Sequence, residues 1–159
     1  KNVCSFFTMK TQASGIEIKT KVGTVHGPIP KLIGDGRRFK QVLINLVKNA
    51  TKFTRQGSIE IIADYESSPV SKLTVHVKDT GVGIATEDLP ALFSRFGKLQ
   101  RTAAINSEGV GLGLTIVKQI VELSGGEVSA HSNGVGQGST FTFTMQMEAA
   151  LDCENDSLN

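Results

Sequence analysis

Residues 35–54 read Asp35-Gly-Arg-Arg-Phe-Lys-Gln-Val-Leu-Ile-Asn-Leu-Val-Lys-Asn-Ala-Thr-Lys-Phe-Thr54. Apolar residues recur in this stretch at the spacing i, i+3, i+4, i+7, i+8 and i+11, which is the period of one face of a helix. They are Phe39, Val42, Leu43, Leu46, Val47 and Ala50. Asp35 stands where an N-cap is expected, so the pattern predicts a long amphipathic helix that buries this stripe.

Strands and shorter helices are predicted around that helix. Alternating apolar and polar residues indicate strands at 16–22, 58–63, 72–78, 127–132 and 140–147. Helical spacing indicates a helix over 2–14 and another that Gly111 and Gly113 introduce and the Gly125-Gly126 pair ends, and a short helix is expected over 89–99. This order predicts an α/β fold of two layers, with one mixed sheet of about five strands and about three helices on one face.

Composition narrows the class of protein. The 159 residues suit one domain, predicted at 1–147, with a polar C-terminal tail or linker at 148–159. Lys and Arg number 17 against 15 Asp and Glu, and a net charge of +2 argues against a dedicated nucleic-acid binder. No apolar run reaches the roughly 18 residues of a membrane span. Cys4 and Cys153 form no metal-binding pair, so we expect unpaired thiols of an intracellular protein, and the start at Lys1 suggests a piece of a longer one.

A polar row lies on the predicted helix beside its apolar stripe. Asn45, Asn49 and Lys52 are spaced i, i+4 and i+7, so they stack along one side. Two amide oxygens one turn apart can share a hard cation, and a lysine one turn further on can reach phosphate oxygens. A solvated helix face without any ligand explains the same residues.

Two glycine-rich segments add chemistry of their own. Asp79-Thr-Gly-Val-Gly-Ile84 follows a predicted strand, where a carboxylate can accept a hydrogen bond from an exocyclic amine. Gly109-Val-Gly-Leu-Gly-Leu-Thr-Ile116 opens a helix, whose free N–H groups and dipole favour an anion. Each segment alone also fits an ordinary turn or a flexible loop. Together with the polar row, they meet the needs of an adenine nucleotide with Mg²⁺.

In this order, the segments resemble the ATP-binding catalytic domain of sensor histidine kinases. That domain belongs to the superfamily of DNA gyrase, the ninety-kilodalton heat-shock chaperones and MutL-type repair proteins. The N box resembles 35–54, the G1 box 79–84, the F box Leu92-Phe-Ser-Arg-Phe96 and the G2 box 109–114, and Gly138-Ser-Thr-Phe141 closes the set. The resemblance extends from about Val3 to Met147 and implies a two-layer sandwich of the Bergerat type that binds ATP and Mg²⁺.

The resemblance also implies roles for individual residues. Asp79 would bind the adenine amino group, Asn49 with Asn45 would hold Mg²⁺, and Lys52 would contact phosphate, so that Asn45, Asn49 and Lys52 form the catalytic set. The segment 97–108 would be a mobile ATP lid anchored by Phe93 and Phe96, and its Lys98 and Arg101 would be either γ-phosphate contacts or solvated charges. The other implied nucleotide contacts are Phe53, Gly81, Gly83, Ile84, Phe96, Lys98, Gly109, Val110, Gly111, Leu112, Gly113, Leu114 and Thr140.

Asn45 separates the activities within this superfamily. Gyrase-like ATPases carry a glutamate there, which acts as the general base that activates water. Asn45 is no base near neutral pH, so we expect a protein histidine kinase with slow hydrolysis of ATP. The alternatives are a superfamily ATPase, an anti-sigma-type serine kinase and an inactive ATP-binding scaffold.

The acceptor histidine is expected on a separate domain. His26, His76 and His131 are predicted in a loop and two strands, and no acidic residue follows any of them. The implied partners are therefore a histidine-bearing dimerisation domain and the receiver domain of a response regulator in a two-component phosphorelay. We expect this chain to be monomeric and cytoplasmic, without nucleic-acid or membrane contact. The full-length parent protein is expected to be a homodimer, with or without a membrane anchor.

Overall fold

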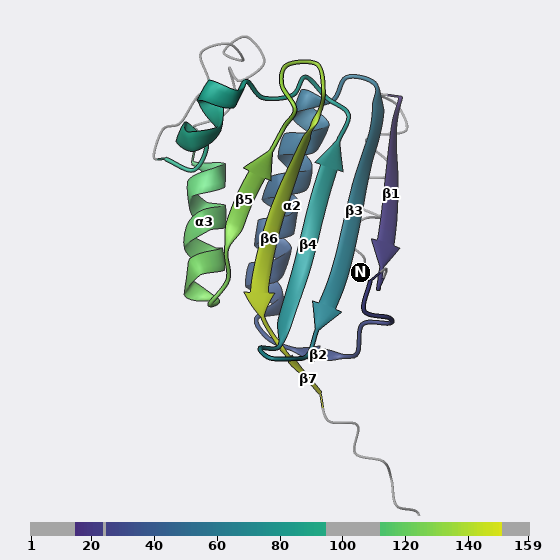
Figure 1. Cartoon of the computed structure of the whole chain (residues 1–159), viewed down its shortest axis with the longest axis vertical. Helices are drawn as coiled ribbons and strands as arrows, with labels where there is room; N and C mark the ends of the chain where they lie inside the picture. The colour runs from purple at the N-terminus through teal and green to yellow at the C-terminus, as the bar shows by residue number, and fades with distance from the viewer. Residues whose placement is uncertain (1–14, 24, 95–111, 151–159) are drawn as a thin grey trace, which may run out of the picture.

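The computed structural model describes residues 15–23, 25–94 and 112–150 (Figure 1). The elements in chain order are β1 (Ile16–Val22), β2 (Leu32–Ile33), α2 (Gly36–Phe53), β3 (Gly57–Glu66), β4 (Lys72–Asp79), η1 (Thr86–Ala91), α3 (Gly113–Leu123), β5 (Val128–His131), β6 (Ser139–Gln146) and β7 (Glu148–Ala149). The helix predicted over 2–14 lies outside the described residues.

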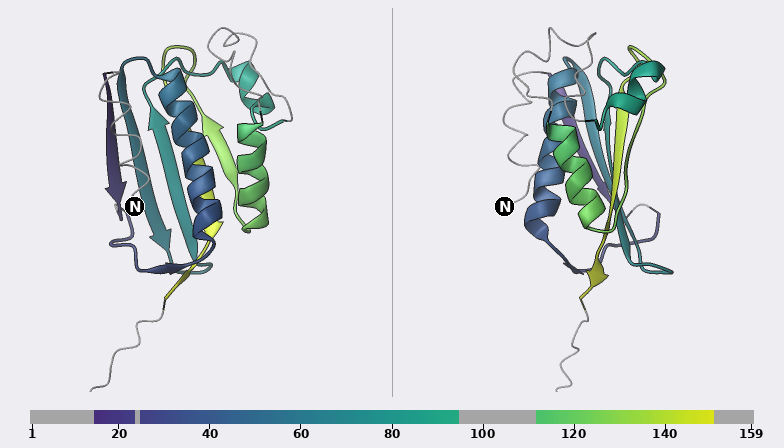
Figure 2. Two further views of the ribbon diagram at one scale, coloured as in Figure 1. Left: turned by 180° about the vertical axis from the view of Figure 1, so that it is seen from behind. Right: turned by 90° about the vertical axis from the view of Figure 1, so that its left-hand side faces the viewer.

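Five strands form one mixed sheet in the order β1-β3-β4-β6-β5. β1 lies parallel to β3, whereas the other three pairs are antiparallel. Figure 2 shows α2 and α3 side by side on one face of this sheet. The predicted two-layer α/β fold with a mixed five-stranded sheet is therefore confirmed.

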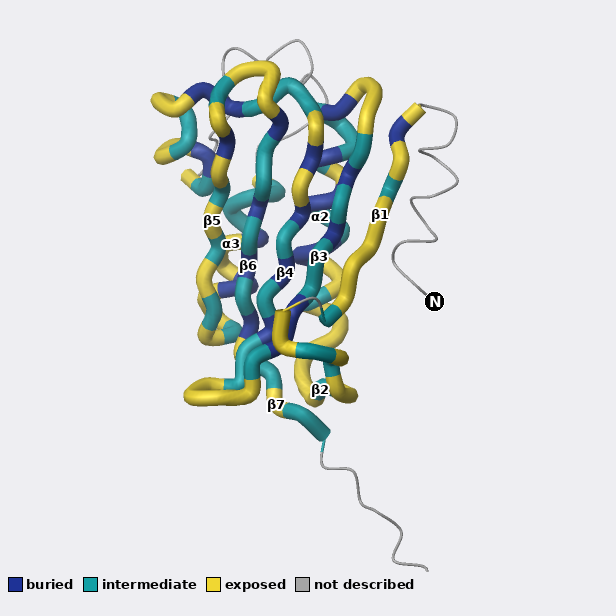
Figure 3. Tube along the Cα trace, turned by 45° about the vertical axis from the view of Figure 1, so that its right-hand side comes forward, coloured by how far each residue is buried: buried dark blue, intermediate teal, exposed yellow. Residues whose placement is uncertain are grey.

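The core fills the space between the sheet and the two helices. Buried residues alternate with more exposed ones along the central strands (Figure 3). The predicted stripe of α2 is buried at Val42, Leu43, Leu46, Val47 and Ala50. Full burial of one such aliphatic side chain contributes on the order of 1.5–3 kcal/mol. Packing against the sheet, more than intrinsic helix propensity, therefore holds α2 in place.

Local signals fix the two ends of α2. The Asp35 side chain accepts hydrogen bonds from the N–H groups of Arg37 and Arg38 at 3.0 and 3.1 Å. These are donors that find no partner inside the helix. Thr54 is extended and ends the helix after Phe53. α2 thus runs from the end of the sheet near β2 to the end where β4 finishes (Figure 1).

The helix predicted over 89–99 is wrong in its type over residues 89–94, and residues 95–99 lie outside the described part of the chain. The described turn is a 3-10 helix, η1, from Thr86 to Ala91. Pro90 has no N–H to donate and disfavours the α conformation of Leu89, so an α-helix does not start here. The turn is instead closed by a hydrogen bond of the 3-10 type, from the Leu92 N–H to the carbonyl oxygen of Leu89 at 3.3 Å.

Two short strands show no pattern in the sequence. β2 and β7 pair antiparallel, with Leu32 opposite Ala149 and Ile33 opposite Glu148. The sequence pattern assigns Glu148 and Ala149 to the polar tail, because a strand of two residues cannot display an alternating period. Pairing between distant parts of the chain alone creates this small sheet.

Candidate functional site

Three segments converge where β4 finishes, which we call the β4 end of the sheet. Asp79 is the last residue of β4, and its register partner Ser139 is the first residue of β6. α2 ends beside them at Phe53, whose carbonyl oxygen accepts a hydrogen bond from Val82 N–H at 3.0 Å. The fold therefore joins the turn after β4 to the end of the long helix.

Asp79 is buried, with only 4% of its surface exposed, and the protein fixes the orientation of its carboxylate. One oxygen, Oδ1, accepts the Gly81 N–H at 2.8 Å, and Oδ2 accepts the Ser139 hydroxyl at 2.6 Å. These bonds offset the cost of burying a charged group. Because a carboxylate accepts about four hydrogen bonds, both oxygens keep capacity for a donor from a ligand.

The turn from Asp79 to Ile84 is fastened to its surroundings. Thr80 and Ser58 of β3 exchange two hydrogen bonds, Thr80 N–H to the Ser58 carbonyl oxygen at 3.1 Å and Ser58 N–H to Thr80 Oγ1 at 3.0 Å. A Cβ added to Gly81 would collide with the carbonyl oxygen of Phe53, so glycine is needed for this close approach. The backbone of the turn is held in one arrangement by the protein itself.

The strand register brings a hydroxyl other than that of Thr140 to Asp79. Thr140 pairs with Lys78, so it lies on the opposite face of the sheet from Asp79 and Ser139. Ser139 is the hydroxyl that contacts the carboxylate. The register therefore favours Ser139 over Thr140 for this contact, because a shift of one residue moves a side chain to the other face. Register is set by strand pairing, which the sequence alone does not reveal.

The polar row of α2 is present as the spacing predicts. Asn45, Asn49 and Lys52 are all partly exposed on the helix. Asn45 donates through Nδ2 to the Gln41 carbonyl oxygen at 3.0 Å, and its Oδ1 lies 3.4 Å from the place a Cβ on Gly113 would occupy. The start of α3 therefore packs against this row. Lys52 Nζ lies 5.7 Å from the centroid of the Phe53 ring.

The donor atoms of this row fit a hard cation that also binds phosphate. Mg²⁺ is commonly held by one or two protein oxygens, with substrate phosphates and waters completing its octahedron. The amide oxygens of Asn45 and Asn49 are donors of that kind. Among residues 15–23, 25–94 and 112–150, no group of three or more His, Cys, Asp or Glu side chains could hold a metal ion.

The start of α3 presents backbone groups rather than a capping side chain. Leu112 stands at the N-cap position, makes no side-chain bond to the first turn and is 37% exposed. The first N–H groups of a helix lack partners within it, and the helix dipole favours an anion there. Thr115 Oγ1 donates to the Ser94 carbonyl oxygen at 3.1 Å, and Leu114 packs partly buried against the core.

The base of the predicted lid is only partly described. Phe93, expected as an anchor of that lid, packs edge-on against Phe141, with ring centroids 6.4 Å apart. The remaining predicted contacts on this side are Phe96, Lys98, Gly109, Val110 and Gly111, and with the segment 97–108 they lie outside the described residues.

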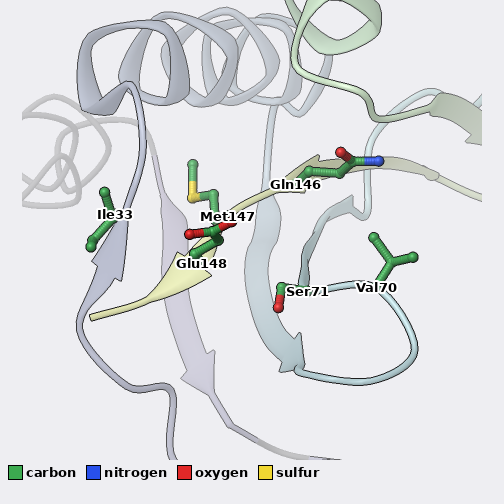
Figure 4. A pocket seen from close by; sticks show the side chains of 6 residues that line it. All are labelled: Ile33, Val70, Ser71, Gln146, Met147 and Glu148. Carbon is green, nitrogen blue, oxygen red and sulfur yellow. The ribbon is translucent and has the colours of Figure 1, made fainter. Parts of the chain in front are cut away.

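A separate pocket of about 430 Å³ lies at the opposite end of the sheet (Figure 4). It is lined by Ile33, Val70, Ser71, Gln146, Met147 and Glu148. β2, β7 and the turn between β3 and β4 form its walls. No residue predicted for nucleotide binding lines this pocket.

The helices were also compared with the requirements of a membrane span. None of the described helices has the length and apolar character that crossing a membrane requires.

Comparison with known protein families shows to which family the chain belongs. The family described as histidine kinase-, DNA gyrase B- and HSP90-like ATPase matches residues 34–149, which include α2, the turn after β4 and the start of α3. The chain belongs to this family of ATPases and kinases.

Individual relatives narrow the resemblance to sensor histidine kinases. Sensor protein GacS of Pseudomonas syringae pv. syringae is 38% identical over 130 residues, which cover 80% of this chain and 14% of GacS. Hybrid signal transduction histidine kinase L of Dictyostelium discoideum is 36% identical over 160 residues, which cover 98% of this chain and 9% of that protein. The crystal structure of full-length ShkA in complex with AMPPNP is similar with a TM-score of 0.78 and 30% identity, over 93% of this chain and 29% of ShkA. The chain therefore has the fold of a histidine kinase ATP-binding domain and spans a small share of the length of these relatives.

Proposed function

We propose that this chain binds Mg²⁺-ATP at the β4 end and transfers the γ-phosphoryl group to a histidine on a separate dimerisation domain. The observation that carries the proposal is Asp79, a buried carboxylate oriented by Gly81 and Ser139 with capacity for another donor. Family membership supports ATP as the ligand. The similar ShkA was crystallised with AMPPNP, an ATP analogue.

Asp79 would select the base because its carboxylate accepts hydrogen bonds and cannot donate one. Adenine carries an exocyclic amine that donates to the carboxylate, whereas guanine carries a carbonyl oxygen at the corresponding ring position, and that oxygen is repelled. The fastened turn from Gly81 to Ile84 would form one wall beside the base, and the Phe53 ring would pack near the adenosine.

The polar row and the start of α3 would hold the triphosphate. Lys52 would supply positive charge, and the free N–H groups around Leu112 and Gly113 would donate to phosphate oxygens. Asn49, with Asn45 beside it, would hold Mg²⁺ through amide oxygens. When bound, Mg²⁺ neutralises charge on the phosphate oxygens.

The transfer step depends on positioning and charge rather than on a protein base. The bond between the γ-phosphorus and the bridging oxygen breaks, a phosphorus–nitrogen bond to the imidazole forms, and ADP leaves. Asn45 cannot take a proton from water, and its amide is bonded to the Gln41 carbonyl oxygen. We therefore expect slow hydrolysis when no acceptor domain is present.

The histidines of the described residues support an acceptor on another domain. His76 is bonded to Thr142 at 2.8 Å on the sheet face away from the helices, and His131 is bonded to Asn133 at 3.1 Å. His26 lies exposed in the connection from β1 to β2. A dimerisation domain and a receiver domain are therefore the proposed partners, and a monomeric chain in the cytoplasm remains our expectation. Relatives named as sensor and hybrid kinases support these partner classes.

The test is calorimetric binding of AMPPNP, with and without Mg²⁺, to this chain and to Asp79→Asn. We expect a Kd on the order of micromolar that depends on Mg²⁺, and a loss of about a hundredfold or more in the variant, because the new amide presents a donor toward the base amine. Asp64→Asn is the matched control, since Asp64 is also a buried carboxylate, bonded to Val25 N–H at 2.8 Å in the connection after β1.

Three outcomes would contradict the proposal. A folded wild-type chain that binds no nucleotide favours the inactive scaffold. Equal binding by wild type and Asp79→Asn removes Asp79 from the site. Rapid steady-state hydrolysis by the chain alone favours an ATPase over a kinase.

A further inference from the structure

The loop between β5 and β6, residues 132–138, runs along the turn after β4. Gly136 N–H donates to the Val82 carbonyl oxygen at 2.7 Å, and Gly138 N–H donates to the Gly81 carbonyl oxygen at 3.1 Å. A Cβ added to Gly83 would collide with the carbonyl oxygen of Gly134 in this loop. The loop therefore backs the turn that the proposed function sets beside the base.

The Ser132 hydroxyl joins the loop to the turn. Ser132 is buried, with 7% of its surface exposed. A hydroxyl carries one proton, and the shortest contact, 2.7 Å to the Gly138 carbonyl oxygen, is the bond that it donates. It accepts the N–H of Ile84 at 3.0 Å and that of Gly134 at 3.3 Å. One small side chain thus ties both ends of the loop to the last residue of the turn.

We propose that Ser132 is a positioning residue for base recognition, whose hydroxyl latches the loop 132–138 onto the turn and thereby sets how strictly the site selects adenine. The inference rests on the proposed nucleotide site at Asp79. A carboxylate discriminates an amine from a carbonyl only while the base is held at hydrogen-bond distance and angle. Loosening the turn at Ile84 lets the base shift and weakens that discrimination, although Asp79 itself is unchanged.

The experiment compares Ser132→Ala with Ser124→Ala in this chain. Ser124 is a matched control because its hydroxyl donates to the Ile120 carbonyl oxygen at 2.9 Å at the far end of α3. Calorimetry gives the Kd for AMPPNP and for its guanine counterpart GMPPNP, both with Mg²⁺. Hydrogen exchange reports protection of the Ile84 amide.

We expect Ser132→Ala to weaken AMPPNP binding about tenfold, with a smaller loss for GMPPNP, so that the preference for adenine narrows. The Ile84 amide should exchange faster. Ser124→Ala should lower thermal stability and leave the preference unchanged. Ser132→Thr, which keeps the hydroxyl, should recover most of the preference.

A second variant keeps the inference testable if Ser132→Ala does not fold. Gly136 has φ +80° and open space where a Cβ would lie, so Gly136→Ala strains only the loop backbone. It should narrow the adenine preference in the same direction. The inference is overturned if Ser132→Ala folds and prefers AMPPNP over GMPPNP as strongly as the wild type does. If only Gly136→Ala folds, the same result in that variant overturns it. Unchanged AMPPNP binding by Asp79→Asn would instead overturn the proposed site itself.

Discussion

Two buried aspartates on neighbouring strands lie near opposite ends of the sheet. Asp64 on β3 is 8% exposed and Asp79 on β4 is 4% exposed, and each accepts a backbone N–H at 2.8 Å. Asp64 accepts its bond from Val25, in the connection between β1 and β2, so this carboxylate helps to hold a loop. The partners of Asp79 are a glycine of its own turn and a serine at the start of β6. A buried, hydrogen-bonded carboxylate therefore does not identify a site by itself.

The surroundings separate the two ends. At the β4 end, side-chain hydroxyls of Thr80, Ser132 and Ser139 fasten a glycine-rich turn beside the polar row of α2. At the other end, backbone pairing of β2 with β7 closes the structure, and Ile33 and Val70 remain more than half exposed. Satisfied buried polar networks specify one geometry, which recognition of a ligand requires. We therefore expect the β4 end to control binding and the β2 end to affect stability only.

After Asp79→Asn and its control Asp64→Asn, the largest difference in AMPPNP affinity is expected between variants of the neighbours Ser139 and Thr140. Ser139→Ala removes the 2.6 Å bond to Asp79 and should weaken AMPPNP binding about tenfold, because a charged acceptor loses the donor that orients it. Thr140→Ala, on the other sheet face, should leave the Kd unchanged. Calorimetry on both variants measures the difference. The reverse order of effects would refute the register argument.

A moderate effect on stability, with no effect on binding, is expected at the N-cap of α2. Hydrogen bonding by the Arg38 N–H is the main cause that lowers the pKa of Asp35 below its ordinary value of 3.8, with Arg37 N–H contributing. The folded state thus favours the carboxylate, so its contribution is complete above the unfolded pKa and is lost as pH falls through the lower folded pKa. Asp35→Ala should be less stable at neutral pH and should lose less stability on acidification below pH 3.8 than wild type.

Thermal unfolding across pH checks that expectation, with AMPPNP affinity at neutral pH as the second readout. A variant that keeps wild-type stability at neutral pH, or that loses nucleotide affinity, contradicts the division between the two ends.

The smallest effect is expected at the pocket near β2. Val70 is 53% exposed, so Val70→Ser should change the free energy of unfolding by less than about 0.5 kcal/mol. AMPPNP affinity should not change, because the pocket lies at the other end of the sheet from Asp79. Chemical denaturation and calorimetry measure both quantities. A clear loss of affinity would mean that the two ends are coupled.

Most of the fold could be predicted because its elements carry strong local signals. The α2 stripe and the Asp35 cap predict that helix to within a residue, and the alternation over 16–22 predicts β1 with its described bounds. Apolar spacing does not predict the 3-10 turn η1, because Pro90 overrides the helical period there. The pairing of β2 with β7 has no local signal at all.

The site was predictable in part. Asn45, Asn49, Lys52 and Asp79 stand out by residue type and spacing, and the fold positions them on α2 and at the end of β4. The sequence does not single out Ser132 or Ser139 as contacts of the turn, because each contact joins residues that are far apart in the chain. The signal available for Ser139 was its place beside Thr140 in the segment Gly138-Ser-Thr-Phe141, where either hydroxyl could have been the contact.

The sequence by itself determined the periodic helices and strands, the N-cap and the residue types suited to an adenine nucleotide, since these depend on neighbours within a few positions. Only the tertiary structure decided which hydroxyl meets Asp79, how the loop 132–138 backs the turn, and where β2 meets β7. Those contacts join residues far apart in the chain. Their geometry follows from strand register and packing, and a shift of one residue reverses the face on which a side chain lies.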